Sequence, residues 1–287
     1  MRVLGGKPPS RQDAWKRRYS QAMASLRPPA VAGTFYPASP EELRSEVEGY
    51  LRDAPAGEGA PPPKALIAPH AGYVYSGPIA GSAFRTLSES AAAIERVVLL
   101  GPSHFVPVQG LALPGHGAFI TPLGAVKIEG EGAQAAIRLP QVRVIPEAHA
   151  REHSLEVELP FLQALLGDFE LVPLAVGRAE PEEVAEVLDR LWGGPETLIV
   201  ISSDLSHYLP YEAAQRADRA TSDAILALRG PLDPYQACGA APINGLLHAA
   251  RSRRLEPRLL DLRNSADTAG DPSRVVGYGA FAFHERN

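Results

Sequence analysis

In Val97-Val-Leu-Leu-Gly-Pro-Ser-His104, four apolar residues are followed at once by a tight turn and a histidine. Two other stretches repeat this arrangement, Ala65-Leu-Ile-Ala-Pro-His70 and Leu198-Ile-Val-Ile-Ser-Ser-Asp-Leu-Ser-His207. Short runs of Val, Ile and Leu that alternate with longer helical segments are typical of a mostly parallel sheet covered by helices. In such a sheet, ligands bind beyond the carboxyl ends of the strands, so the three histidines are expected at one mouth.

The whole chain follows this alternation, which predicts a single α/β domain with a mostly parallel central sheet flanked by helices. We expect residues 1–26 to form a basic, flexible extension and residues 27–287 to form the domain. The expected strands span residues 65–68, 97–100, 142–145, 171–176, 198–201, 259–262 and 275–283. The expected helices span residues 40–53, 77–88, 153–166, 181–192, 211–228 and 234–253.

The composition narrows the class of protein. Of the 287 residues, 45% are hydrophobic and 21% are charged, which is typical of a globular chain with a sizeable core. The net charge of -5 gives no electrostatic reason to expect nucleic acid or an anionic membrane as partner. No apolar run reaches the length of about eighteen residues that a membrane-spanning helix needs, and the basic start lacks the apolar centre of a secretory signal. With one cysteine there is no intrachain disulfide, which suits the cytoplasm.

The three strand-end histidines carry the clearest chemical signal. A single histidine after a strand is usually a turn residue bonded to nearby backbone. Three at equivalent positions favour a shared site instead. Neutral imidazole is the commonest protein ligand of transition metals, and rigid strand ends leave coordination positions open for substrate or water.

Two further polar residues allow two interpretations each. Asp204, three residues before His207, either holds the ring of His207 in one tautomer or caps the following helix. Cys238 is either a small inert hydrophobe or, near a helix N-terminus or a metal, a ligand or nucleophile.

The string His149-Ala-Arg-Glu-His153 matches the H-x-x-E-H pattern of inverzincin peptidases. That chemistry needs both histidines on one face of a helix. Pro146 lies upstream and Ser154 is a suitable helix cap, so we expect His149 to fall outside the helix and the match to be accidental. Glu152 and His153 are still expected to border the pocket, together with Ser103 and Tyr73.

Taken together, the motifs resemble the Memo family, whose bacterial and archaeal members are often called AmmeMemoRadiSam system protein B. The matching strings extend in the family's order from Arg27 to near the end of the chain. They are Arg27-Pro-Pro-Ala-Val-Ala-Gly-Thr-Phe-Tyr-Pro37, Ala68-Pro-His-Ala-Gly-Tyr-Val-Tyr-Ser-Gly77, Gly101-Pro-Ser-His104, Glu152-His-Ser-Leu-Glu156, Ser202-Ser-Asp-Leu-Ser-His207 and Cys238-Gly239.

This resemblance implies a fold similar to class III extradiol dioxygenases, in which two histidines and a carboxylate hold Fe(II). In the Memo pattern a cysteine replaces the carboxylate, which transfers by position to His70, His104 and Cys238 as metal ligands. His207 matches the acid/base histidine of the dioxygenases, and Asp204 matches its neighbour, so both are expected to be catalytic.

Three functions follow as expectations. The first is a metal-dependent oxidoreductase that uses Fe(II) or copper. The second is a non-catalytic protein that binds a peptide or small ligand and works with a radical SAM partner. The third is a zinc hydrolase, because two histidines and a cysteine with an open position also suit a water-activating zinc. The sequence names neither a substrate nor an oligomeric state.

Overall fold

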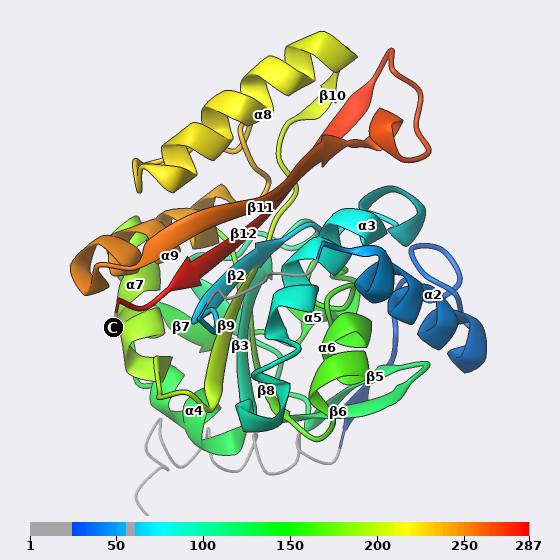
Figure 1. The fold of residues 1–287 in the computed structure, drawn as a ribbon. Coiled ribbons are helices and arrows are strands. Elements are labelled where there is room, and N and C mark those ends of the chain that lie inside the picture. Colours follow the sequence, from blue (N-terminus) through cyan, green and yellow to red (C-terminus); the bar gives the residue numbers. More distant parts are fainter. Residues whose placement is uncertain (1–24, 56–60, 287) are drawn as a thin grey trace, which may run out of the picture.

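The computed structural model describes residues 25–55 and 61–286. Within these residues, twelve strands form one mixed sheet with the main path β1-β5-β6-β8-β3-β9-β2-β12-β10, while β11 pairs with β12 and β4 pairs with β7 and β8 (Figure 1). The strands are β1 (Leu26–Arg27), β2 (Ala65–Ala68), β3 (Arg96–Pro102), β4 (Leu111–Leu113), β5 (Ala118–Thr121), β6 (Gly124–Ile128), β7 (Val142–Val144), β8 (Glu170–Val176), β9 (Thr197–Ser202), β10 (His207–Leu209), β11 (Glu256–Asn264) and β12 (Val275–His284).

The centre of the sheet consists of β8, β3, β9 and β2, which are mutually parallel. Almost every residue of these strands is buried, as the continuous Val, Ile and Leu runs predict for strands covered on both faces. Ala68 pairs with Ser202, and Leu100 pairs with Ile201. The parallel register therefore ends β2, β3 and β9 at one edge of the sheet, and their following loops meet there.

Helices cover both faces of the sheet (Figure 1). One layer contains α2, α3 and α6, which pack against one another, and the opposite layer contains α4, α7 and α9. α8 packs on β11 and β12. The helices are α2 (Pro40–Asp53), α3 (Tyr73–Phe84), α4 (Gly130–Ala136), α5 (Glu147–Ala150), α6 (Leu159–Leu166), α7 (Pro181–Leu191), α8 (Tyr211–Leu226) and α9 (Ala240–Arg253), with short 3-10 turns η1 (Arg85–Leu87), η2 (Ala91–Ala93) and η3 (Ser265–Asp267).

The predicted α/β architecture is confirmed, and α2 matches its predicted bounds. Ser39 accepts a hydrogen bond from the backbone N–H of Glu42, and Pro40 opens the helix with acids in its first turn. Each of these features stabilises a helix N-terminus.

Two helices begin later than predicted. The helix expected from residue 153 begins at Leu159, and Ser154 is no cap, because its hydroxyl donates to the carbonyl of Pro102. The helix expected from residue 234 begins at Ala240, since Asp233 turns the chain by accepting from the backbone N–H groups of Tyr235 and Gln236. In both places, side-chain bonds to the backbone compete with the helix.

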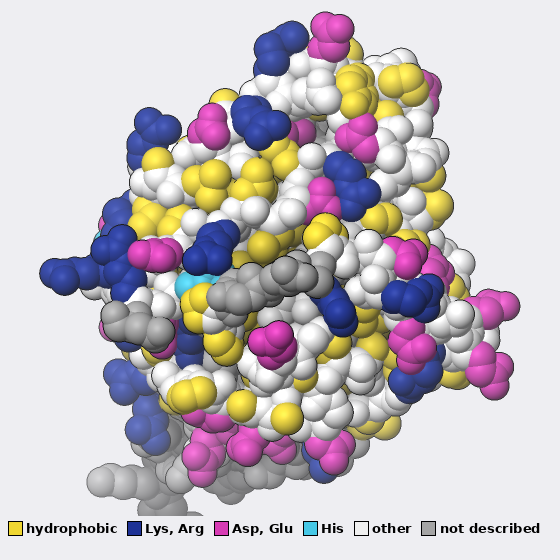
Figure 2. Space-filling model, viewed as in Figure 1, with side chains coloured by type: hydrophobic (Ala, Val, Ile, Leu, Met, Phe, Trp, Pro, Cys, Tyr) yellow, Lys and Arg dark blue, Asp and Glu magenta, His cyan; other side chains and the backbone are white. Residues whose placement is uncertain are grey.

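The sequence prediction missed the short strands β1, β4, β5, β6 and β10. Leu26, which was assigned to the N-terminal extension, is already part of β1 and pairs with Ala118. The rest of that extension lies outside the described residues, apart from Ser25. Lys and Arg side chains and Asp and Glu side chains are both scattered over the face seen in Figure 2. Among the helices in the described part of the chain, none is long and apolar enough to cross a membrane.

Candidate functional site

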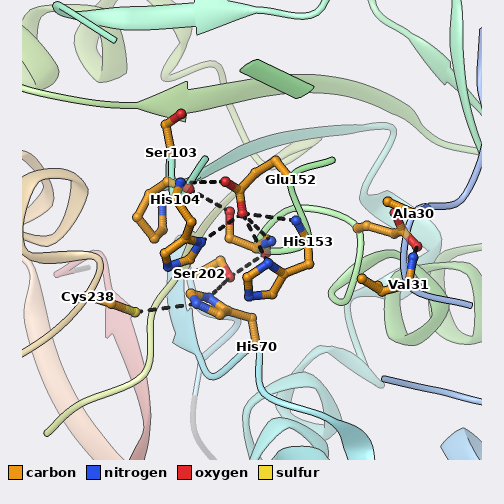
Figure 3. Close-up of polar contacts among 12 residues, drawn as sticks. Ala30, Val31, His70, Ser103, His104, Glu152, His153, Ser202 and Cys238 are labelled. Carbon is orange, nitrogen blue, oxygen red and sulfur yellow. Dashed lines mark hydrogen bonds and ion pairs between the residues drawn. The ribbon is translucent and has the colours of Figure 1, made fainter. Parts of the chain in front are cut away.

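Three imidazoles converge at the carboxyl edge of the central strands (Figure 3). His70 follows β2, His104 follows β3, and His153 lies in the turn between α5 and α6. One ring nitrogen from each lies within 4.8 Å of the other two. The rings of His104 and His153 stack at 4.7 Å between centroids, and His70 meets both edge-on at 5.3 and 5.4 Å. Three nitrogens this close form a cluster of the size that one metal ion requires.

Glu152 orients two of these histidines. Its Oε1 lies 2.9 Å from Nδ1 of His104 and accepts the backbone N–H groups of His153 and Ser154, while Oε2 accepts the backbone N–H of His104 at 2.6 Å. Burial raises the pKa of this carboxyl, but the hydrogen bonds and charge of His104 and the backbone N–H groups outweigh it and hold the pKa at about 2. Glu152 is therefore an ionised orienting group, and Nδ1 of His104 carries a proton toward it, leaving Nε2 for a ligand.

His70 is oriented by a hydroxyl instead. Its Nδ1 lies 2.7 Å from Oγ of Ser202, the last residue of β9. Burial lowers the pKa of His70 well below its ordinary value, and it lowers that of His153 to about 4. Both rings are thus neutral near neutral pH, which is the form that binds metals.

Cys238, which the family resemblance implies as a ligand, lies beside His70. Its Sγ lies 3.4 Å from Nε2 of His70 and accepts the backbone N–H of Asp204 at 3.3 Å. Gly239 allows this approach, because a Cβ there would lie 2.6 Å from Cβ of Ser203. Burial, and then the charge of Asp204, raise the pKa of the thiol to about 12. A nearby cation would therefore be needed to produce the thiolate.

Asp204 does not have the contacts that the sequence suggested. Its Oδ1 accepts the backbone N–H of His70 at 2.8 Å, so it fixes the loop after β2 rather than capping α8. Among the contacts of the described residues, none joins it to the ring of His207. Burial raises the pKa of Asp204 to about 6. The positive charge of a protonated His207 would lower the pKa of Asp204, so the two side chains lie close enough to interact electrostatically.

His207 lies on β10, next to the cluster rather than in it. Its Nδ1 donates to the carbonyl of Leu205 at 2.8 Å, which leaves Nε2 as the acceptor. Its charge would lower the pKa of His70, so the two rings interact electrostatically. Asp218 of α8, which sequence reasoning missed, supports this segment by accepting the backbone N–H of Ser206 at 3.0 Å.

The four expected pocket residues have different positions. Glu152 and His153 belong to the cluster described above. Ser103 lines a cavity of about 580 Å³ that Cys238 also borders. Tyr73 is buried in the core, with its hydroxyl donating to the carbonyl of Val157, because it begins α3 and packs against the aromatic rings of that layer.

His153 is the ligand candidate that the sequence analysis undervalued. The H-x-x-E-H string fails as a zinc-peptidase motif, because His149 ends in the core with Nε2 on the carbonyl of Ala112. His149 lies in the short helix α5, outside α6, the helix that carries Leu159 and Leu162, as expected. The useful signal was the adjacent pair Glu152-His153, which supplies an orienting carboxylate and a ring from one turn.

A buried ion pair fastens this turn to the start of the domain. Arg27 pairs with Glu156 and also donates to the carbonyls of His149 at 3.0 Å and Glu152 at 2.5 Å. Glu156 in turn accepts the backbone N–H groups of Ala30 and Val31. The first segment of the domain is thereby tied to the turn that carries two site residues.

Comparison with known proteins assigns the family. The Memo-like protein family model matches residues 27–282. A MEMO1 family protein of Methanopyrus kandleri is 38% identical over 286 residues, covering 90% of this chain and 98% of its own length. MEMO1 family proteins of Aeropyrum pernix and Aquifex aeolicus are 38% and 36% identical, with 89% and 90% of this chain and 98% and 99% of their own lengths covered. The chain belongs to the Memo family.

Proposed function

We propose that this Memo-family protein is a metal-dependent oxidoreductase whose ion is held by His70, His104 and His153, with Cys238 as a further ligand beside His70. The observation that carries this proposal is the approach of three imidazole nitrogens to within 4.8 Å of one another. Two of the three rings have their second nitrogen held by a neighbouring oxygen, on Glu152 or Ser202. Such orientation is typical of metal-ligating histidines.

The donor set suits Fe(II) or copper. Imidazole binds both ions, and a thiolate shifts the preference toward copper or zinc. No carboxylate belongs to the cluster among the described residues, since Glu152 is occupied by His104 and backbone N–H groups. When bound, a redox-active ion would supply electron transfer to or from a substrate. Of the proposed ligands, Cys238 borders a cavity of about 580 Å³, which the three histidines do not line.

In this proposal, side chains of the protein transfer the substrate proton. His207 donates through Nδ1 to Leu205, so its Nε2 has a lone pair available for a substrate proton. Asp204 would stabilise the resulting imidazolium through its charge rather than through a direct bond. His207 is therefore the acid/base in this proposal, and Asp204 is a positioning residue that also holds the backbone of His70.

Metal analysis tests the proposal most directly. Protein grown without added metal should take up close to one equivalent of Fe(II) under anaerobic conditions, or of copper. His153→Ala should weaken binding by at least about tenfold, given the usual importance of such ligands. His248→Ala, at a partly exposed surface histidine beside Glu182, is the matched control. Absence of uptake, or equal binding by both variants, would contradict the proposal.

Uptake of zinc alone, with hydrolysis of activated esters, would instead favour the hydrolase. Oxygen consumption with a panel of catechols and other phenols, each compared between wild type and His207→Ala, separates the redox reaction from hydrolysis.

One observation favours the binding-protein alternative. Large hydrophobic side chains are exposed near these histidines in the sequence: Phe105 and Tyr208 directly follow His104 and His207, and Val74 and Tyr75 lie four and five residues after His70. Exposed aromatic residues at a site often contact a ligand or partner, here a peptide, a small ligand or a radical SAM protein. On this alternative, Phe105→Ser would abolish the cellular role and His207→Ala would preserve it.

A further inference from the structure

The hydroxyl of Ser202 has more partners than it has protons. Its Oγ lies 2.5 Å from the carbonyl of Ser154, 2.7 Å from Oε1 of Glu158 and 2.7 Å from Nδ1 of His70. A serine hydroxyl donates one hydrogen bond and accepts at most two. The three short contacts are therefore compatible only if two of the three partners donate to it.

The chemistry of the partners decides the direction of each bond. The carbonyl of Ser154 can only accept, so it takes the hydroxyl proton. If Glu158 were ionised, its Oε1 would face a lone pair of Ser202 at 2.7 Å, and two oxygens would repel each other. If His70 lacked a proton on Nδ1, the same conflict would arise there. Both Glu158 and Nδ1 of His70 must therefore carry a proton toward Ser202.

The surroundings of Glu158 agree with a neutral acid. The side chain is fully buried, and its Oε2 has no hydrogen-bond partner among the described residues. None of the ion pairs in the described part of the chain includes it, and the like charge of Asp204 raises its pKa. Burial raises the pKa of Glu158 well above its ordinary value. An isolated carboxylate in such a place would be costly, whereas a carboxylic acid is tolerated.

We propose that Ser202, whose proton is held by the carbonyl of Ser154, locks His70 in the Nδ1–H tautomer and keeps its Nε2 lone pair directed at the metal site. In this proposal Glu158 is a protonated positioning residue that donates to the second acceptor position of Ser202 and so keeps the hydroxyl in this orientation. The importance of this tautomer for metal binding rests on the proposed function. The tautomer itself is a property of the metal-free protein, so the two ideas can fail separately.

Infrared and NMR spectra of the metal-free protein test the protonation states. Wild type should show the carbonyl stretch of a protonated carboxylic acid at pH values well above the ordinary glutamate pKa of about 4.3. Glu158→Gln should remove that band. Nitrogen shifts of isotope-labelled histidine should assign the Nδ1–H form to His70. An ionised Glu158, or His70 protonated on Nε2, would overturn the inference.

Paired substitutions test the route through Ser202. Glu158→Gln can still donate, through its amide, so His70 should keep its tautomer and the affinity for Fe(II) or copper should change by less than about threefold. Glu158→Leu is similar in size but cannot donate, and Ser202→Ala removes the shared acceptor. Each should shift the His70 nitrogen signals, and Ser202→Ala should weaken metal binding by about tenfold or more.

The folding of every variant would be checked by thermal melting, so that loss of structure is not mistaken for loss of position. A merely structural role for Glu158 would change the melting temperature without moving the His70 nitrogen signals. That result would overturn the proposal, as would Glu158→Gln behaving like Glu158→Leu.

Discussion

Two glutamates stand behind the same histidine cluster and are in opposite charge states. Glu152 accepts four hydrogen bonds, three of them from backbone N–H groups, and its pKa is held at about 2. Glu158, six residues on in the same turn, has one hydroxyl neighbour and an oxygen without a partner among the described residues, and its pKa is raised. Both are buried, so burial alone does not decide their charge. The number of hydrogen-bond donors that face each carboxyl group decides its charge.

The largest effect on stability is expected from removing the charge of a third glutamate in the turn, Glu156. Glu156→Gln leaves the guanidinium of Arg27 buried without its anion, which should cost about 3–5 kcal/mol of unfolding free energy. Urea denaturation measures this. Arg52→Met, at an exposed pair with Asp53, should change stability by less than about 1 kcal/mol. Equal effects of the two substitutions would show that the buried ion pair contributes no more to the unfolding free energy than an exposed pair does.

Replacement of Glu152 or Glu158 by Gln should have very different effects on metal affinity. In Glu152→Gln an amide NH₂ must face a donor, either the backbone N–H of His104 or its Nδ1–H, so the ring of His104 should lose its fixed orientation. Metal affinity should fall by about 10–100-fold, as is usual for such orienting groups. Glu158→Gln should have almost no effect. Metal titration of the two variants, side by side, measures the difference, and similar losses would contradict the assigned charges.

A buried base in the preceding helix α5, His149, is also neutral. Burial lowers its pKa to about 3, and its Nδ1 has no partner in the described structure. The unfolded chain takes up a proton near pH 6.5 and the folded chain does not, so stability falls as the pH drops below about 6.5. Between about pH 7.5 and pH 5 the loss should be about 2 kcal/mol. Urea denaturation of wild type and His149→Gln at both pH values checks this, because the variant should lack that part of the slope.

The smallest effect is expected at Ser103, which like Ser202 lies beside a site histidine. Its hydroxyl has one hydrogen bond, to the carbonyl of Val106 at 2.7 Å. Ser103→Ala should therefore cost about 1 kcal/mol of stability and leave metal affinity within about twofold. A loss of affinity as large as that of Ser202→Ala would mean that Ser103 contacts the metal or its water directly.

Much of the fold follows from local pattern. Continuous Val, Ile and Leu runs give β2, β3, β8 and β9 to within one residue at most ends, since strands covered on both faces need no alternation. The short strands β4, β5 and β6 were missed, because their three to five residues carry too little periodicity. Residues 153–158 were predicted as helix, because the pattern of Leu155, Leu159 and Leu162 continues through them, while buried carboxylate contacts hold them in another conformation.

The sequence alone was enough to predict that His70 and His104 lie at one edge of the sheet, because both directly follow parallel strands. The family resemblance added Cys238, which comes from a distant loop. Only the tertiary structure decided that His153 completes the cluster, that Asp204 binds the backbone of His70, and that Tyr73 is buried in the core. The physical reason is that strand ends are fixed by local pattern, whereas the direction of a side chain in a turn depends on contacts made by residues far away in the chain.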